Sequence, residues 1–355
     1  MSDLRVGFIG SGFARRVQLP GLAHVPGTKP VAIASGRRAN ADAVARDFKL
    51  PLVFDDGVEL ARSPDVDLVI VSSTPESHAR YAIAALEAGK HVLCEKPMAI
   101  DAFEAAQMVA ASEQHPDSIA WLDHELRFEP NRRRVRELIR SNAIGELRHI
   151  ELSLKPYLRG DGRPQTFDAP WNWWFDSSRG GGILGAVGSH LIDLCRFWSG
   201  SEIRFVGGLV ETFVRQRTDD TGQARPVTAD DFASCVLQTA SGVVATITLS
   251  TVAHHGPGHS GQVTGSEGTL VLSGETKLEF GKSGGPLEDI SAKDDLWERT
   301  KPNNMWARSF VRLLREMVHV IRGGAPQGEP ATFRDGWQVQ RVLDAVRAAR
   351  GVRLD

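Results

Sequence analysis

Short apolar runs in the first third of the chain alternate with stretches in which apolar residues recur at helical spacing. The run Val66–Val71 is nearly all apolar, as expected for a strand buried on both faces. From His78 to Gly89 the apolar positions follow a helical period, and Asp101 with Glu104 resembles a capping box at the start of another helix. The strands expected here are Arg5–Ile9, Val31–Ala34, Val66–Val71 and His91–Cys94. This alternation predicts a parallel sheet with crossover helices.

The pattern changes after Asp123, where consecutive alternating runs are joined by short turns such as Ser241-Gly242. The strands predicted in this part are Ile150–Leu154, Arg204–Phe213, Phe232–Gln238, Val243–Leu249 and Thr269–Leu272. The predicted helices are Asn131–Arg140, Met305–Ile321 and Arg334–Arg350. We therefore expect an α/β protein with two domains, residues 1–124 and 125–355. The second should carry a mostly antiparallel sheet, and the last helix is a candidate to pack back on the first domain.

Length and composition agree with two globular domains, because 355 residues exceed what one core usually supports. The 42 basic and 44 acidic side chains nearly cancel, which argues against a nucleic-acid or anionic-membrane partner. Cys94, Cys195 and Cys235 are scattered, which favours a reducing compartment and no structural metal. We recognise no export signal and no apolar run long enough to span a bilayer, so we expect a soluble, cytoplasmic protein.

A glycine pair, Gly10-Ser11-Gly12, directly follows the first predicted strand and precedes Phe13 and Ala14 in a helical stretch. Gly10 would permit the tight turn, and Gly12 would let the backbone approach a pyrophosphate at the helix amino terminus. The third glycine of the usual fingerprint is absent, since Arg15 stands there. The alternative is an ordinary strand-to-helix turn.

The second predicted strand ends in Ala34-Ser35-Gly36-Arg37-Arg38. A carboxylate at this place would bind the ribose hydroxyls of NAD and repel a phosphate. With Ser35, Arg37 and Arg38 instead, the loop favours the extra phosphate of NADP, although NAD stays possible. The alternative is that both arginines are solvated residues at the start of a helix.

The segment Cys94-Glu95-Lys96-Pro97 ends a predicted parallel strand, where open sheets bind their ligands. Together with Thr74-Pro75 and His78 it resembles the glucose-fructose oxidoreductase, inositol dehydrogenase and MocA (Gfo/Idh/MocA) family. The resemblance spans nearly the whole chain. It continues through Arg127-Phe128, Gly180-Gly181-Gly182, Gly188-Ser189-His190, Asp193 and Gly265-Ser266-Glu267-Gly268.

The resemblance implies an amino-terminal Rossmann domain that binds NAD(P), with Thr74, Pro75, His78 and Glu95 near the cofactor. It implies a carboxy-terminal α/β domain with a large, open, mostly antiparallel sheet that covers the substrate. It also implies that Lys96 lies beside the nicotinamide and the reacting carbon. The chemistry of the side chain supports this role independently. An ammonium group can hydrogen-bond the substrate oxygen and stabilise the alkoxide-like character that develops during hydride transfer. The alternative is a surface lysine that pairs with Glu95.

His190 is the leading candidate for acid-base work, because its ordinary pKa is near neutrality. Asp193 lies three residues later on the same helical face and could orient the imidazole, bind substrate hydroxyls or make a structural bond. Most dehydrogenases of the family carry an aspartate four residues before this histidine, and Ala186 stands there instead. Either another acid, such as Asp193 or Asp176, substitutes, or the substrate differs. A histidine that only packs behind the glycine turn is the alternative.

The stretch Trp171-Asn172-Trp173-Trp174-Phe175-Asp176 is unusually aromatic. Sugars stack on indole rings while amides and carboxylates bind their hydroxyls, so Trp171, Asn172, Trp173 and Asp176 are candidate substrate-binding residues. The aromatic rings could equally pack at a domain interface. Arg127 is expected to face the substrate, whereas the arginines of the following helix, Arg132, Arg133, Arg134 and Arg136, are expected to form a solvated face.

The main hypothesis is an NADP-preferring dehydrogenase or reductase for a sugar, polyol or related carbonyl compound. We expect a homodimer or homotetramer, with no metal. One alternative is a glycosidase that uses nicotinamide transiently, and it would release sugar without net cofactor turnover. Another, motivated by Ala186, is a cofactor-binding sensor without hydride transfer.

Overall fold

The computed structural model describes residues 2–155, 168–297 and 299–349 of the chain. The chain forms two compact units, each built from two separate segments. The first consists of the chain up to Glu129 together with Asp294–Trp337. The second consists of Pro130–Lys293 together with the chain from Gln338. The division falls within the last helix, α9 (Phe333–Ala348).

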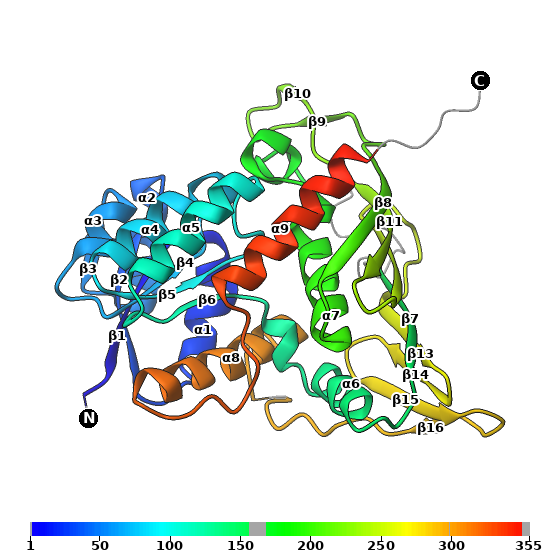
Figure 1. The fold of residues 1–355 in the computed structure, drawn as a ribbon. Helices are drawn as coiled ribbons and strands as arrows, with labels where there is room; N and C mark the ends of the chain where they lie inside the picture. The colour runs from blue at the N-terminus through cyan, green and yellow to red at the C-terminus, as the bar shows by residue number, and fades with distance from the viewer. Residues whose placement is uncertain (1, 156–167, 298, 350–355) are drawn as a thin grey trace. The chain divides into compact units, whose positions relative to one another are not determined.

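The first unit contains a six-stranded sheet in the order β3-β2-β1-β4-β5-β6, and all neighbouring strands pair in parallel (Figure 1). Its strands are β1 (Leu4–Ile9), β2 (Thr28–Ala34), β3 (Leu52–Phe54), β4 (Leu68–Val71), β5 (His91–Cys94) and β6 (Ala120–Leu122). This order reverses between β1 and β4, and ligands of open parallel sheets bind at the carboxyl ends of the strands near such a reversal.

Helices cover both faces of this sheet. They are α1 (Leu19–Leu22), α2 (Arg38–Phe48), α3 (Gly57–Arg62), α4 (His78–Glu87), α5 (Ala102–Gln114) and α8 (Met305–Ile321), with the short turns η1 (Ala14–Gln18), η2 (Pro75–Ser77) and η3 (Glu125–Phe128). Alternate strand residues enter two separate cores, as the strand period requires. Phe8 and Ile70 pack with Phe310 of α8 on one face, whereas Val69 and Val71 pack on the other.

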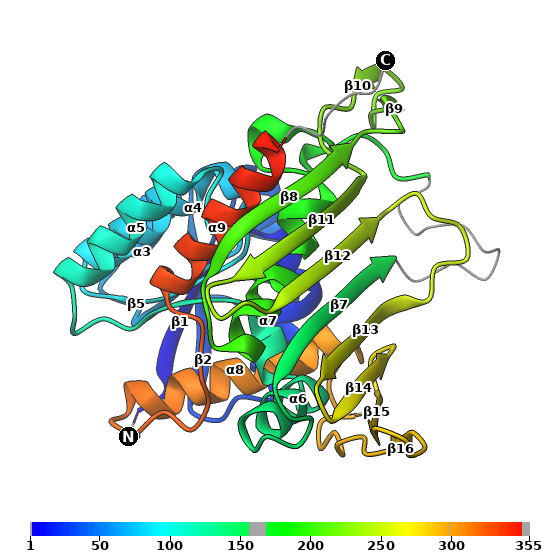
Figure 2. The same cartoon turned by 45° about the vertical axis from the view of Figure 1, so that its right-hand side comes forward.

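The second unit is built on an eight-stranded sheet in the order β16-β15-β14-β13-β7-β12-β11-β8 (Figure 2). β12 and β7 pair in parallel, and the other neighbouring strands pair antiparallel. The strands are β7 (Leu147–Lys155), β8 (Ile203–Glu211), β11 (Phe232–Thr239), β12 (Val244–Ser250), β13 (Gly258–Gly265), β14 (Gly268–Ser273), β15 (Lys277–Lys282) and β16 (Glu288–Asp289), with β9 (Gln216–Thr218) and β10 (Ala224–Pro226) forming a separate ribbon.

One face of the large sheet is apolar and buried, and α7 packs against β7 and β12 there. Leu152, Ile247 and Val263 point to this face and are almost fully buried. The remaining helical segments of this unit are α6 (Pro130–Arg140), α7 (Ser189–Ser199), η4 (Trp173–Phe175), η5 (Ser177–Arg179) and η6 (Leu184–Gly188). The opposite face carries exposed apolar side chains, including Phe205, Leu209 and Val236.

The fold class predicted from the sequence is confirmed, with a parallel sheet of Rossmann type followed by a mostly antiparallel sheet. Among the described residues, seven strands were not predicted, namely β3, β6, β9, β10, β13, β15 and β16, and β8 ends earlier than predicted. β13 was not expected, because its glycines and polar residues break the alternation, yet it lies between β7 and β14. β8 ends at Glu211, before Phe213, because the Asp231 carboxylate accepts the backbone N–H groups of Phe213 and Val214. Arg350, the predicted end of the last helix, lies outside the described residues.

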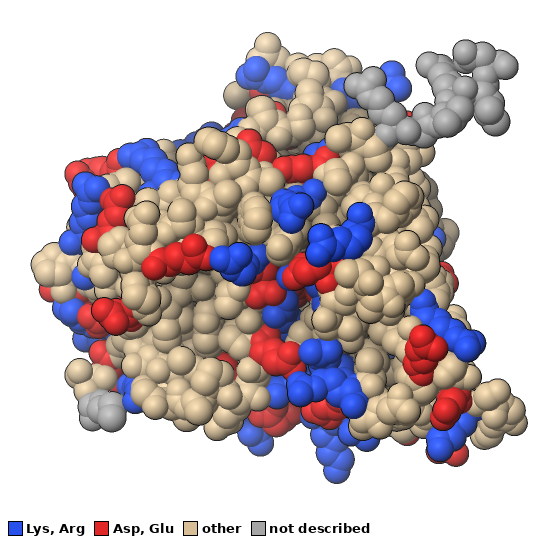
Figure 3. All heavy atoms as spheres, viewed as in Figure 1, with Lys and Arg blue, Asp and Glu red and all other residues tan. Residues whose placement is uncertain are grey.

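Acidic and basic side chains are interspersed over the face of the molecule seen in Figure 3. That face therefore presents no large field of one sign, in keeping with the net charge of -2. A bilayer-spanning helix would need a long apolar stretch, and the part of the chain that the structure describes contains none.

Candidate active site

The glycine turn after β1 is held tightly against the loop after β4. Gly10 has φ +111°, and a Cβ atom added there would lie 2.3 Å from the Ser72 carbonyl oxygen, so only glycine fits. At Gly12 an added Cβ would meet nothing within 4 Å, which leaves the backbone open on that side. Phe13 precedes the π-helical turn η1, and Ala14 is buried at its start. Gly10 and Gly12 therefore have the two properties that a pyrophosphate-binding turn requires.

The end of β2 places Ser35 beside this turn, with its hydroxyl 3.0 Å from that of Ser11. Arg38 opens α2, and its guanidinium group pairs with Asp42 at 2.9 Å and with Asp55 at 2.6 Å. Arg37 is exposed and extended at the N-cap position of α2. The two arginines therefore differ, because the charge of Arg38 is already matched by two carboxylates.

The loop after β4 carries Thr74 and Pro75, and Pro75 begins the turn η2. His78 follows as the first residue of α4 and is 1% exposed. Its ring nitrogens lie 3.0 Å from the Pro97 carbonyl oxygen and 3.2 Å from that of Ser73. Burial lowers the pKa of His78. In the neutral form only one ring nitrogen donates, and the shorter contact, to Pro97, would join the start of α4 to the loop after β5.

Lys96 lies at the carboxyl end of β5, one residue after the buried Glu95. The backbone N–H of Glu95 donates to the Val71 carbonyl at 2.8 Å, which ties this loop to the end of β4. Lys96 is half-buried. The sheet therefore gathers the glycine turn, the Thr74 loop and Lys96 at the same edge, as the parallel register requires.

Two further carboxyl groups, those of Asp123 and Glu125, are buried close to Lys96. They belong to the loop after β6 and to η3, and each is 1% exposed. Burial raises the pKa of both carboxyl groups, and the positive charge of Lys96 opposes the shift. The sequence analysis did not predict these two residues. Their signal was present, since acidic residues directly follow the apolar strand β6.

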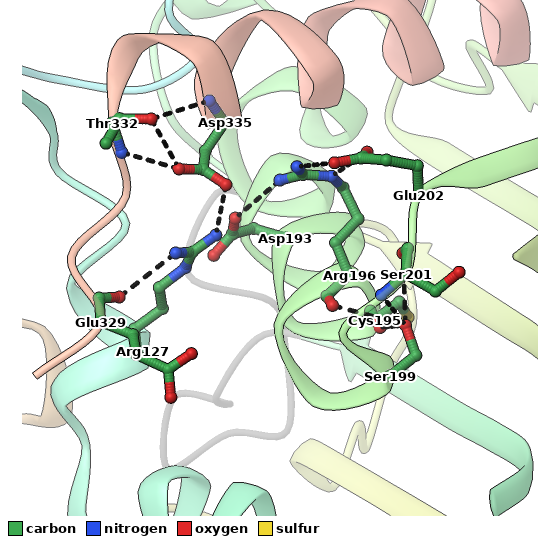
Figure 4. Close-up of polar contacts among 10 residues, drawn as sticks. All are labelled: Arg127, Asp193, Cys195, Arg196, Ser199, Ser201, Glu202, Glu329, Thr332 and Asp335. Atoms are coloured by element: carbon green, nitrogen blue, oxygen red, sulfur yellow. Dashed lines mark hydrogen bonds and ion pairs between the residues drawn. The ribbon is translucent and has the colours of Figure 1, made fainter. Parts of the chain in front are cut away.

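Arg127 is buried at the end of η3, and its guanidinium group is engaged within the first unit (Figure 4). It donates to the Glu329 carbonyl oxygen at 3.2 Å and to the Asp335 carboxylate at 3.2 Å. The other oxygen of Asp335 accepts from the backbone N–H and the hydroxyl of Thr332. Arg127 thus links η3 to the start of α9.

His190 and Asp193 lie on the helix α7 of the second unit, and both are 1% exposed. Asp193 forms an ion pair with Arg196 at 3.6 Å, and Arg196 in turn binds Glu202 through two hydrogen bonds (Figure 4). The structural bond considered for Asp193 is therefore present. Ala186 lies in the π-helical turn η6 immediately before α7.

The aromatic stretch forms the turn η4, in which the polar side chains cap backbone groups. Asn172 accepts from the Trp174 N–H at 3.0 Å and donates to the Pro170 carbonyl at 3.0 Å. Asp176 accepts from the Ser178 N–H through one oxygen. Trp171 donates its indole N–H to the Pro226 carbonyl, and the Trp173 ring is half-buried.

The solvated arginine face predicted for α6 is wrong at one position. Arg132 is completely buried, and its guanidinium group contacts the buried His259. Arg132 shares the inner side of α6 with Val135 and Leu138, one and two helical turns away. The helix therefore turns an arginine, and not only apolar residues, toward the interior of the second unit.

The part of the chain that the structure describes contains no group of three or more metal-ligating side chains. The chain matches two protein-family models. Residues 4–122 match one described as "Oxidoreductase family, NAD-binding Rossmann fold", and residues 132–271 match one described as "GFO/IDH/MocA C-terminal domain".

Similar proteins carry related names. An uncharacterized oxidoreductase of Synechocystis sp. is 31% identical over 280 residues, which cover 78% of this chain and 74% of the relative. Glucose-fructose oxidoreductase domain-containing protein 2 of Xenopus laevis is 29% identical over 96% of this chain and 90% of its own length. An oxidoreductase domain protein from Kribbella flavida has a structure with a TM-score of 0.84 at 27% identity, covering 98% of this chain and 97% of its own.

A levoglucosan dehydrogenase solved with NADH and L-sorbose has a TM-score of 0.85 at 24% identity, over 98% of this chain and 97% of its own. At this identity the likeness shows the fold alone. The match of both domains and the 31% identity to the Synechocystis protein show more. This chain belongs to the Gfo/Idh/MocA family of oxidoreductases, whose amino-terminal domain has the NAD-binding Rossmann fold.

Proposed function

We propose that this protein is an NAD(P)-dependent dehydrogenase that transfers a hydride between the nicotinamide and a sugar, polyol or related carbonyl compound. The observation that carries the proposal is the position of Lys96. Its half-buried side chain follows β5 at the edge of the sheet that also holds the glycine turn. The amino-terminal part, up to residue 124, would bind the cofactor, and the remainder would bind the substrate.

The residues at this edge fit a dinucleotide. The open backbone at Gly12 leaves room for a pyrophosphate at the start of η1. The backbone N–H groups of Phe13 and Ala14 at this start would be its hydrogen-bond donors. Thr74 and Pro75 in the next loop, with Ser35 at the end of β2, would line the rest of the cofactor site. His78 and Glu95 are both buried, so they would support the cofactor site from the protein interior.

When bound, the nicotinamide accepts or supplies the hydride. Lys96 would donate a hydrogen bond from its ammonium group to the substrate oxygen, and this bond strengthens as negative charge develops there. His190 would take the hydroxyl proton during oxidation and return it during reduction. Asp193, through its pair with Arg196, would fix the part of α7 that carries His190.

The proposed substrate class is supported by the aromatic turn and by the levoglucosan dehydrogenase of the same fold, which was solved with L-sorbose. Trp171 and Trp173 offer ring faces for stacking on a sugar. Asp176 uses one carboxylate oxygen in its cap, which leaves the other for a substrate hydroxyl. Asn172 and Arg127 would need to exchange backbone or carboxylate partners to bind substrate directly.

Replacing Lys96 tests the proposal. We expect Lys96→Met to lower kcat by about 100- to 1,000-fold, as for loss of one donor to a developing oxyanion, while the Kd of the cofactor changes little. Lys90→Met is the matched control, because Lys90 precedes the same strand at its opposite end. Absorbance of the reduced nicotinamide reports turnover with a panel of sugars, inositols and lactones. Unchanged turnover in Lys96→Met would remove Lys96 from the chemistry.

The same panel separates the alternatives. Release of sugar without net change in reduced nicotinamide would favour a glycosidase with transient redox chemistry. Cofactor binding without hydride transfer to any compound would favour a sensor.

We further propose that NADP is preferred to NAD and that Arg37 is the residue that selects it. Arg37 is exposed at the end of β2, whereas Arg38 is held by Asp42 and Asp55. We expect Arg37→Ala to weaken NADP binding by about 10-fold, the cost of one charge-assisted hydrogen bond, without weakening NAD binding. Arg38→Ala is the control. Equal losses for both cofactors would refute phosphate recognition by Arg37.

We also propose that the protein works in the cytoplasm as a homodimer or homotetramer. The free thiols Cys94, Cys195 and Cys235 are all buried, which suits a reducing compartment. The exposed row of Phe205, Leu209 and Val236 on the open sheet face suits contact with a second copy. A monomeric mass in analytical ultracentrifugation at micromolar concentration would refute the oligomer.

A further inference from the structure

The inference concerns the proton of one buried carboxyl group, that of Asp123. β5 and β6 pair in parallel, and their last residues, Cys94 and Leu122, lie opposite each other. Glu95 and Asp123, the next residue of each segment, are therefore neighbours. The Asp123 backbone N–H donates to the Cys94 carbonyl at 2.7 Å and fixes this placement. Glu95 is 7% exposed and Asp123 is 1% exposed, so water solvates neither group freely.

Glu95 accepts hydrogen bonds at both carboxylate oxygens. The side-chain N–H of Gln18, at the end of η1, donates to Oε1 at 2.9 Å. The backbone N–H of Lys96 donates to Oε2 at 3.3 Å. Gln18 is fully buried, and its own amide oxygen has no hydrogen-bond partner among the described residues. Burial raises the pKa of Glu95, whereas the charge of Lys96 and the hydrogen bonds from Lys96 and Gln18 lower it. These two donors therefore favour the ionised form of Glu95 over that of a buried carboxyl group without donors.

Asp123 has the opposite environment. No protein N–H or O–H group among the described residues donates to either oxygen of its carboxyl group. The Glu95 side chain lies within hydrogen-bonding reach of that carboxyl group. An ionised carboxylate only accepts, so two ionised groups could not form a hydrogen bond here. A single proton would satisfy both groups, and the donors that already point at Glu95 favour its place on Asp123.

The charges around Asp123 agree with this assignment. Burial raises the pKa of Asp123 most, and the neighbouring carboxyl groups of Glu125 and Glu95 raise it further, while Lys96 lowers it. Burial also raises the pKa of Glu125 and of the Cys94 thiol, both of which lie near Glu95. These shifts favour the neutral forms of Asp123, Glu125 and Cys94, while Lys96 favours the ionised form of Glu95.

We propose that Asp123 is a positioning residue that stays protonated and donates a hydrogen bond to Glu95, thereby holding Glu95 as the carboxylate beside Lys96. The reaction at Lys96 belongs to the proposed function, and Asp123 acts on it only through Glu95. A neutral donor at position 123 should therefore preserve the site, and loss of the donor should disturb it.

The first test uses infrared difference spectroscopy of the intact protein, which needs no turnover. Relative to Asp123→Asn, the wild-type protein should show the carbonyl stretch of one additional protonated carboxylic acid at neutral pH, with a shift in deuterated water. Glu113→Gln, a change at an exposed carboxylate, should remove no such band. Absence of the band at neutral pH would overturn the inference.

The second test is kinetic and compares Asp123→Asn with Asp123→Leu. Asparagine keeps an N–H donor and leucine does not, at similar size. We expect Asp123→Asn to retain kcat within about 3-fold, and Asp123→Leu to lose about 10-fold or more, with unchanged cofactor Kd in both. If Asp123→Asn is as impaired as a folded Asp123→Leu at neutral pH, the neutral-donor role is wrong. If Asp123→Leu does not fold, the asparagine variant and the infrared band still decide.

The two tests also separate this inference from the proposed function. If Lys96→Met keeps full turnover, the proposed chemistry fails, but the infrared band still reports the proton on Asp123. If the band is missing, the inference fails whatever Lys96 does.

Discussion

The two candidate catalytic side chains lie in contrasting surroundings. Lys96 in the first unit follows a strand and is surrounded by buried acids, namely Glu95, Asp123 and Glu125. His190 in the second unit lies in the helix α7, and Asp193, three residues later, pairs with Arg196. In the first unit, buried carboxyl groups lie close to the charge of Lys96. In the second unit, the ion pair described on α7 joins an acid and a base of the same helix.

The local backbone, by contrast, is alike in the two units. A π-helical turn leads into each helix of interest, η1 before α1 and η6 before α7. Such turns are rare and occur often at functional sites. In the first unit the turn ends at Gln18, which donates to Glu95, and in the second it carries Ala186. Similar backbone thus presents an amide side chain in one unit and a methyl group in the other.

The largest effect is expected at His190. If the second unit supplies the proton transfer, His190→Ala should lower kcat by about 100- to 10,000-fold. Initial rates with the substrate panel measure this loss. His149→Ala, on the half-exposed β7 strand, is the control. Activity above about a tenth of wild type would leave the proton transfer to the first unit alone.

Glycine substitutions give the next largest effect. Gly10→Ala should destabilise the fold by about 2–4 kcal/mol, because its positive φ and the Ser72 backbone leave no room for Cβ. Gly12→Ala should leave the melting temperature unchanged and weaken NAD(P) binding, since its Cβ meets only open space. Gly188→Ala in the second unit should cost less than Gly10→Ala, because its Cβ would meet a movable end of Leu249 at 2.8 Å. Thermal melting and cofactor titration measure these changes.

If Gly12→Ala instead lowers the melting temperature as much as Gly10→Ala, the turn is structural and the proposed pyrophosphate site is wrong. Equal destabilisation by Gly188→Ala would mean that the two units are equally intolerant at these turns.

The smallest effect concerns stability against pH. Burial, followed by the charge of Glu95, raises the pKa of Glu125 in the folded protein above its value in the unfolded chain. The folded state therefore binds this proton more tightly, and stability falls as pH rises from the ordinary glutamate pKa through the raised one. Glu125→Gln should remove this loss and add about 1 kcal/mol or more at alkaline pH, with no gain at acid pH.

Urea unfolding at several pH values measures that difference. Glu113→Gln, at an exposed carboxylate paired with Arg334, should show no such pH-dependent gain. A gain from Glu125→Gln that is the same at all pH values would mean that ionisation of Glu125 is not its cause.

Much of the fold was predictable because local pattern and tertiary structure agree. His91–Cys94 and Met305–Ile321 match the predicted bounds, since each is an apolar pattern with clear ends. The position of Lys96 at the edge of the sheet followed from the same pattern.

What the sequence did not reveal depends on register and on helix rotation. The sequence pattern marked Asp123 only as the end of the first domain and not as a site residue. Its closeness to Glu95 arises only when β5 and β6 pair. Arg132 was expected in solvent because charge outweighed helical period in that prediction, yet its rotation about α6 faces the interior. Arg38 was expected to bind phosphate, yet its guanidinium group pairs with Asp42 and Asp55. Asp42 lies in α2 and Asp55 directly follows β3, so the second pair forms only once the chain has folded.

The composition of the first unit has a consequence for protein synthesis. This unit needs Asp294–Trp337, including α8, whose Phe310 fills the same core as Phe8 of β1. The strand β6 is also joined to Thr332 through a β-bridge at Trp121. While the ribosome is still translating the second sheet, the nascent parallel sheet therefore lacks one of its covers. The apolar face of that sheet is completed only after α8, more than 180 residues later than β6, has been synthesised.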